Sequence, residues 1–75
     1  MGKSLISNNI RKLRFNHDEM TQQQLAEKAS VTRQTIVALE QGKYSPSLEL
    51  AFRISLVFNL PLEEVFFIEN KEEFL

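Results

Sequence analysis

Apolar residues recur at helical spacing near the start of the chain. Ile6, Ile10 and Leu13 stand at relative positions i, i+4 and i+7, which is the spacing of one face of an α-helix. This pattern predicts an amphipathic helix from about Ser7 to Phe15. The polar residues that follow are expected to form a loop.

The stretch from Thr21 to Gln41 contains two helix starts that lie eleven residues apart. Thr21 can cap the first helix, and Gln24 completes a capping box with it. Thr32 can cap the second helix. Eleven residues leave room for only about two and a half turns before the chain must bend, so both helices are short and must pack on each other. This is the geometry of a helix-turn-helix.

The second half of the chain predicts two further helices. Gly42 can end the third helix, and Ser47 can cap a fourth that runs to about Phe58. Pro61 suits the start of a fifth helix, which we expect to reach Phe66. No definite strand is predicted, although residues 66–69 and 71–75 could be extended. We therefore expect an all-α fold of five helices in a single domain, residues 1–75.

The second helix of the helix-turn-helix turns polar side chains away from its core. Arg33, Gln34 and Val37 lie on this outward face. Arginine pairs with guanine, glutamine pairs with adenine, and valine can contact a thymine methyl group. An ordinary solvated face is the alternative, but the position of these residues at the start of this helix favours base contacts in DNA.

The segment QQQLAEKASVTRQTIVALEQGKYSPSLELAFRIS resembles the Cro/C1-type helix-turn-helix of the XRE superfamily of bacterial and phage regulators. Several separated features match together: Leu25-Ala26, Ile36, Leu39-Glu40, Gly42-Lys43, Pro46 and the helix of residues 60–66. The resemblance covers residues 10–66 and implies a lambda-repressor-like fold. It also implies that the third helix enters the major groove of double-stranded DNA and that the protein binds DNA as a dimer.

The resemblance also implies roles for individual residues. Gln22 is expected to contact a phosphate, although it could simply be a polar residue that starts a helix. The expected contacts to the DNA backbone are Gln22, Thr32, Lys43 and Tyr44, and the expected structural ion pair is Arg14 with Glu40. Tyr44 could instead rest on the surface of the domain.

Two features depart from the family pattern. Ser30 stands at the turn position that is usually glycine. A positive φ at Ser30 would cost about 1 kcal/mol relative to glycine. The loop from Phe15 to Met20 is one residue longer than is common in the family.

The net charge of −1 is divided unevenly along the chain. Residues 1–43 carry seven basic and four acidic residues, a net charge of +3, whereas residues 44–75 carry two basic and six acidic residues, a net charge of −4. Binding of DNA needs local rather than overall positive charge. The basic half contains the helix-turn-helix, residues 21–41, so this distribution agrees with DNA as a partner.

The fourth helix is more apolar than a surface helix needs to be. Eight of the twelve residues from Ser47 to Phe58 are apolar, which indicates burial on more than one side. We therefore expect residues 47–75 to form a homodimer interface, although scattered exposed apolar residues are common. The candidate contacts are Phe52, Phe66, Phe67 and Phe74.

Composition argues against an enzyme. The chain has no cysteine, one histidine and two glycines, so it offers no thiolate ligand, no recognisable metal-site spacing and no glycine-rich phosphate loop. We expect no metal and no cofactor. No apolar run reaches membrane-spanning length, so we expect no signal peptide, no membrane contact and a cytoplasmic, nucleoid-associated location.

These features predict a sequence-specific transcriptional regulator, namely a dimeric repressor that reads an inverted repeat. The alternative is a protein-binding module of the same fold, an antitoxin or adaptor, in which DNA binding is secondary or absent.

Overall fold

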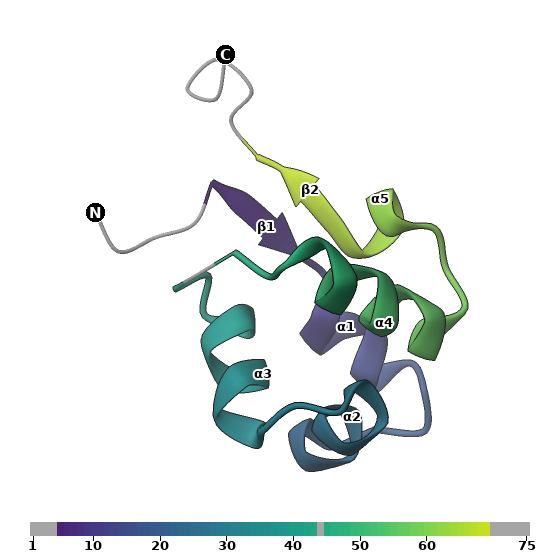
Figure 1. Cartoon of the computed structure of the whole chain (residues 1–75). Coiled ribbons are helices and arrows are strands. Elements are labelled where there is room, and N and C mark those ends of the chain that lie inside the picture. Colours follow the sequence, from purple (N-terminus) through teal and green to yellow (C-terminus); the bar gives the residue numbers. More distant parts are fainter. Residues whose placement is uncertain (1–4, 44, 70–75) are drawn as a thin grey trace.

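The computed structural model describes residues 5–43 and 45–69. In these ranges five helices follow one another in the sequence between two short strands, which lie side by side in Figure 1. The order is β1 (Ile6–Asn8), α1 (Ile10–Phe15), α2 (Gln22–Ala29), α3 (Arg33–Glu40), α4 (Leu48–Phe58), α5 (Leu62–Val65) and β2 (Phe66–Ile68). The expected fold of five helices is confirmed, with a small sheet as a minor addition.

The two strands pair in an antiparallel sheet, with Ile6 opposite Ile68 and Asn8 opposite Phe66. The predicted start of the first helix at Ser7 is therefore wrong, because Ser7 lies in β1 and the helix begins at Ile10. Ile6 reaches the core from a strand, so its helical spacing to Ile10 does not reflect a shared helix. The possible extended conformation after α5 is confirmed for residues 66–68.

The predicted caps of α2, α3 and α4 are present. The Thr21 hydroxyl accepts a hydrogen bond from the backbone N–H of Gln24 at 3.0 Å, and the Gln24 side chain accepts one from the backbone N–H of Thr21 at 2.8 Å. Thr32 caps α3 through the N–H of Thr35 at 3.3 Å. Ser47 caps α4 in the same way. Each cap satisfies a backbone donor that the helix itself leaves unpaired.

The core receives at least one fully buried aliphatic side chain from each helix. Examples, one from each helix, are Ile10, Leu25, Ile36, Ile54 and Val65, all 0% exposed. Burial of such a side chain stabilises a fold by about 1.5–3 kcal/mol. Because the core draws on all five helices, it fixes α2 and α3 relative to each other and relative to α4.

The turn between α2 and α3 passes through Ser30, which has φ of 61°. The N–H of the next residue, Val31, donates to the carbonyl of Ala26 at 2.9 Å and closes the turn. Ser30 therefore has the positive φ for which the sequence predicted a backbone cost relative to glycine. Gly42, after α3, has a similar φ of 70°.

We expect Ser30→Gly to raise the free energy of unfolding by about 0.5–1 kcal/mol, because it removes the Cβ atom from a left-handed position. Gly42→Ala should lower the free energy of unfolding by a similar amount. No atom lies within 4 Å of a Cβ built at Gly42, so this second change adds backbone strain without a clash. Urea unfolding measures both changes, and equal stability of all three chains would contradict the prediction.

Candidate nucleic-acid interface

The outer face of α3 is accessible while its inner face is buried. Ile36 and Leu39 lie in the core, whereas Arg33 and Gln34 are exposed and Val37 is partly exposed. The cap at Thr32 begins the helix at Arg33, so these side chains lie within its first two turns. The structure thus brings the three expected base-contacting residues onto one accessible surface.

Two grooves flank α3. One of about 720 Å³ lies between α1, α2 and α3, and the other, of about 800 Å³, lies on the opposite side of α3. Arg33, Val37 and Gln41 line both grooves and recur every four residues. They therefore form a ridge along α3 between the two grooves. Gln41 was missed from the sequence, although its spacing from Val37 was the available signal.

An ion pair forms the floor of the first groove. The Nε atom of Arg14 lies 2.6 Å from one carboxylate oxygen of Glu40, and its Nη2 atom donates to the other at 3.0 Å. The Nη1 atom also donates to the carbonyl of Met20 at 2.8 Å. The two charged side chains are only 14% and 9% exposed. This pair ties α1 to the end of α3 and to the residue before the α2 cap.

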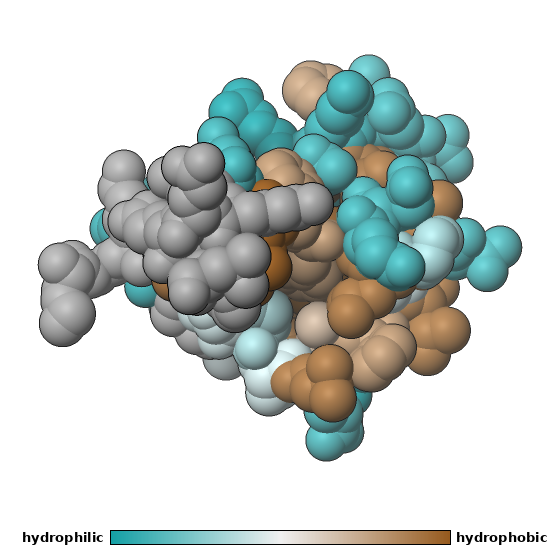
Figure 2. Space-filling model, turned by 90° about the horizontal axis from the view of Figure 1, so that it is seen from above, coloured by the Kyte–Doolittle hydropathy of each residue, from teal (hydrophilic) through white to brown (hydrophobic). Residues whose placement is uncertain are grey.

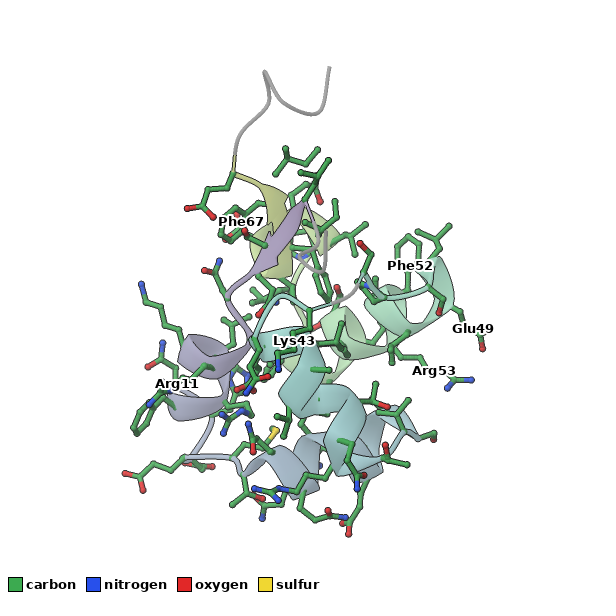
Figure 3. The ribbon with its side chains drawn as sticks, turned by 90° about the vertical axis from the view of Figure 1, so that its left-hand side faces the viewer. Arg11, Lys43, Glu49, Phe52, Arg53 and Phe67 are labelled. Carbon is green, nitrogen blue, oxygen red and sulfur yellow. The ribbon has the colours of Figure 1, made fainter. Side chains whose placement is uncertain are left out.

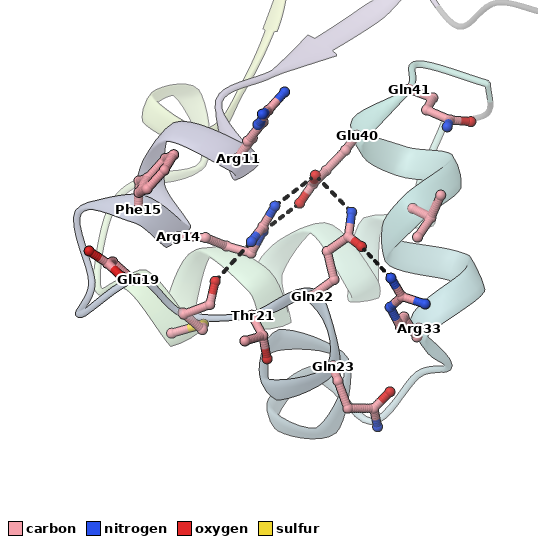
Figure 4. Close-up of a pocket in the computed structure, with 12 residues that line it drawn as sticks. Arg11, Arg14, Phe15, Glu19, Thr21, Gln22, Gln23, Arg33, Glu40 and Gln41 are labelled. Carbon is pink, nitrogen blue, oxygen red and sulfur yellow. Dashed lines mark hydrogen bonds and ion pairs between the residues drawn. The ribbon is translucent and has the colours of Figure 1, made fainter.

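Gln22 extends this pair into a chain of contacts that ends at Arg33 on the outer face of α3 (Figure 4). Its amide nitrogen donates to Glu40 at 3.2 Å, and its amide oxygen accepts from Nη2 of Arg33 at 3.2 Å. The guanidinium group of Arg33 is therefore held over the groove by a residue of α2. The Arg33 contact was not foreseen from the sequence, because it joins side chains eleven residues apart.

The remaining expected backbone-contacting residues are partly described. Thr32 is exposed beside its capping hydrogen bonds. Lys43 is exposed just after α3 and forms no ion pair with the described part of the chain. Tyr44 lies outside the described residues.

The expected dimer contacts fall into three groups. Phe52 is 50% exposed on α4, and Phe67 is 38% exposed on β2. In Figure 3 Phe52 projects from the side of the molecule opposite Arg11. Phe66 is only 7% exposed and packs in the core of its own chain, so its assignment to an interface is corrected. Phe74 lies outside the described residues.

The described helices give no sign of a membrane or metal site. None of them is long and apolar enough to cross a membrane. Within residues 5–43 and 45–69, no three histidine or acidic residues group together as a metal site would require.

A five-helix fold that exposes the outer face of its third helix is that of a helix-turn-helix protein. Residues 10–65 match the helix-turn-helix family, and the chain belongs to this family. The resemblance seen in the sequence is thereby confirmed, as is the expectation that the chain is not an enzyme.

Curated relatives cover most of the chain. An uncharacterized HTH-type transcriptional regulator of Methanocaldococcus jannaschii is 45% identical over 89% of this chain and all of its own length. Another from Archaeoglobus fulgidus is 49% identical over 84% of this chain and 89% of its own. The Bacillus subtilis regulator YgzD is 39% identical over 88% of this chain and 98% of its own.

A solved structure shares the fold. The crystal structure of a candidate DNA-binding protein from Bacteroides fragilis aligns with a TM-score of 0.70. It covers 83% of this chain and 98% of its own, at 21% identity. At this identity the likeness concerns the fold alone.

We expect Glu40→Ala to lower the free energy of unfolding by about 3 kcal/mol, because it leaves the largely buried Arg14 charge without its partner. Glu49→Ala is the matched control, since it breaks the pair with Arg53, whose side chains are 74% and 45% exposed. That change should cost less than about 1 kcal/mol. Urea unfolding compares them, and equal losses would show that burial of the Arg14 pair has no special effect.

Proposed function

We propose that this chain is a sequence-specific DNA-binding transcriptional regulator that reads DNA with α3 in the major groove. The observation that carries the proposal is the exposed ridge of α3, on which Arg33 is held by Gln22. A side chain that is already held in position loses less conformational freedom when it binds, so the contact with Gln22 favours a defined base partner for Arg33. The family and the relatives support DNA as the partner.

Three residues of α3 would read bases. Arg33 would donate two hydrogen bonds to guanine, and Gln34 would pair with adenine. Val37, one turn after Arg33, would contact a thymine methyl group. All three are accessible in the folded chain.

The DNA backbone would be bound beside this surface. Gln22 lies at the first position of α2, where backbone N–H groups have no partner within the helix and favour phosphate. Because its side-chain amide is engaged with Glu40 and Arg33, we assign the phosphate contact at Gln22 mainly to its backbone N–H. Thr32, Lys43 and Tyr44 are the other proposed backbone contacts.

An apolar stripe on α4 supports a homodimer. Leu48, Phe52 and Leu56 recur every four residues and are 68%, 50% and 76% exposed. Apolar residues also gather on one side of the molecule in Figure 2. Contiguous apolar surface of this kind marks interaction sites. We assign the interface to this stripe, to Phe67 of β2 and to Phe74.

Two copies would explain how so small a reader selects a site. One recognition helix covers few base pairs, whereas a two-fold dimer reads two half-sites about 34 Å apart, in an inverted repeat. Repression requires only that the dimer occupy its operator, so we propose a repressor that acts in the cytoplasm on the nucleoid.

The same apolar stripe would also suit a protein partner, as in an antitoxin or adaptor. The net charge of −4 on residues 44–75 agrees with this alternative, because that half would repel DNA. Salt dependence separates the two functions, since the affinity of a DNA reader falls steeply with salt.

Arg33→Ala should weaken binding to a selected cognate duplex by about 1–3 kcal/mol and relax preference at one base pair. Lys28→Ala is a control, because it removes an exposed charge from α2 that lines neither groove beside α3. Selection from a random duplex pool followed by fluorescence anisotropy measures both effects. An equal loss on every sequence would make Arg33 a phosphate contact instead.

Phe52→Glu and Phe67→Glu should each yield monomers that keep their helical content but lose site-specific binding. The physical reason is that each places a charge in an interface that must exclude water. Phe15→Ser is the control for the mass alone, since Phe15 is 63% exposed on α1, outside the proposed dimer interface, but lines the groove beside α3. Sedimentation equilibrium gives the mass, and a wild-type chain that stays monomeric at tens of micromolar, free and on DNA, would refute the dimer.

A further inference from the structure

Helix α1 carries an excess of positive charge that the fold does not use. Its six residues include Arg11, Lys12 and Arg14 and no acidic residue. Arg14 is consumed by its ion pair with Glu40. Arg11 and Lys12 are exposed, and their side chains form no ion pair or hydrogen bond with other described residues. Two adjacent cations therefore remain available on α1.

These two cations line a groove beside α1. The groove has a volume of about 570 Å³. Its lining residues are Asn8, Asn9, Arg11, Lys12, Phe15, Asn16 and Glu40. Glu40 is the one carboxylate among them, and its charge is neutralised by Arg14. The α1 groove therefore has a net positive lining.

The α1 groove adjoins the groove beside the proposed base-reading surface. Arg11, Phe15 and Glu40 line both of them. Figure 4 shows Arg11 on the α1 wall, across the groove from α3. The acidic residue Glu19 lines the groove beside α3 but not the α1 groove. The two grooves thus lie next to each other between α3 and α1, and Arg11 and Lys12 both line the one that Glu19 does not line.

We propose that the α1 groove binds the phosphodiester backbone of DNA that flanks the base pairs read by α3. Arg11 and Lys12 neutralise phosphates in the α1 groove without reading sequence, because phosphates are the same at every base pair. The ligand is a polymer of regularly spaced anions, which can extend from the groove beside α3 into the adjoining α1 groove. This inference rests on the proposed function. It adds contacts from α1, so that the protein covers a longer stretch of DNA than α3 alone would.

The length of the duplex distinguishes phosphate binding by the α1 groove beyond the half-site from phosphate contacts within the half-site. Two duplexes carry the same site, selected from a random pool, and differ only in the flank on the α1 side. One extends beyond the half-site and the other stops at its edge. Fluorescence anisotropy at several salt concentrations gives the slope of log K against log salt, which counts the neutralised phosphates.

On the long duplex, Arg11→Ala and Lys12→Ala should each reduce the salt slope by about one, so that affinity falls about 3.5-fold less between 50 and 200 mM salt. On the short duplex both variants should match the wild type, and base preference should be unchanged on either duplex. Lys28→Ala is the matched control, because it removes an exposed cation that lines none of these grooves.

If Arg11→Ala and Lys12→Ala leave the salt slope on the long duplex unchanged while Lys43→Ala lowers it, phosphate binding by the α1 groove is refuted. The proposed function would then remain intact. Equal reductions of the salt slope on both duplexes would place the contacts of Arg11 and Lys12 within the half-site and would also refute binding of the flanking DNA. A wild-type chain whose duplex binding ignores salt would instead refute the proposed function itself.

Discussion

Joint burial of five short helices is the constraint on which this molecule depends. The helices have between four and eleven residues, below the length at which isolated helices are stable in water. Each contributes at least one side chain that is fully removed from solvent. No helix can therefore keep its position without the others, and the exposed ridge of α3 is held in place by Ile36 and Leu39, which are buried beneath it.

Electrostatics adds orientation to this packing. The Arg14–Glu40 pair connects α1 to α3, and Gln22 carries the connection on to Arg33. A charged pair with so little exposure contributes modest net stability, because desolvation opposes the attraction. Its main effect is geometric, since it restricts where the guanidinium group of Arg33 can lie.

The parts of the fold that local signals control were predictable from the sequence. Thr21, Thr32 and Ser47 cap their helices within three residues, so a short window contains the whole interaction. The sheet was not predictable in this way, because its register joins Ile6 to Ile68 across nearly the whole chain.

In the candidate site, too, features set by local sequence were predictable and features set by the packing of distant segments were not. The outward position of Arg33 follows from helical periodicity. Its contact with Gln22 and the groove beside Arg11 depend on how three helices pack, which no local pattern contains. The position of Gln41, in contrast, follows from its helical spacing to Val37. The burial of Phe66 likewise depends on β2 folding back beside β1, whereas its exposed neighbour Phe67 has the same chemistry and faces the other side of the sheet.

Asn8 joins the sheet to the rest of the domain, and this has a consequence for biosynthesis. Its side-chain nitrogen donates to the carbonyl of Leu39 at 2.8 Å, while its strand pairs with residues 66–68. The N–H of the next residue, Asn9, donates to the carbonyl of Val65 at 2.9 Å. During translation, β1 must therefore wait unpaired until the ribosome has released β2. Folding of this chain is completed after synthesis of its second strand rather than in step with the emerging helices, since pairing of distant segments is the slow part of a fold.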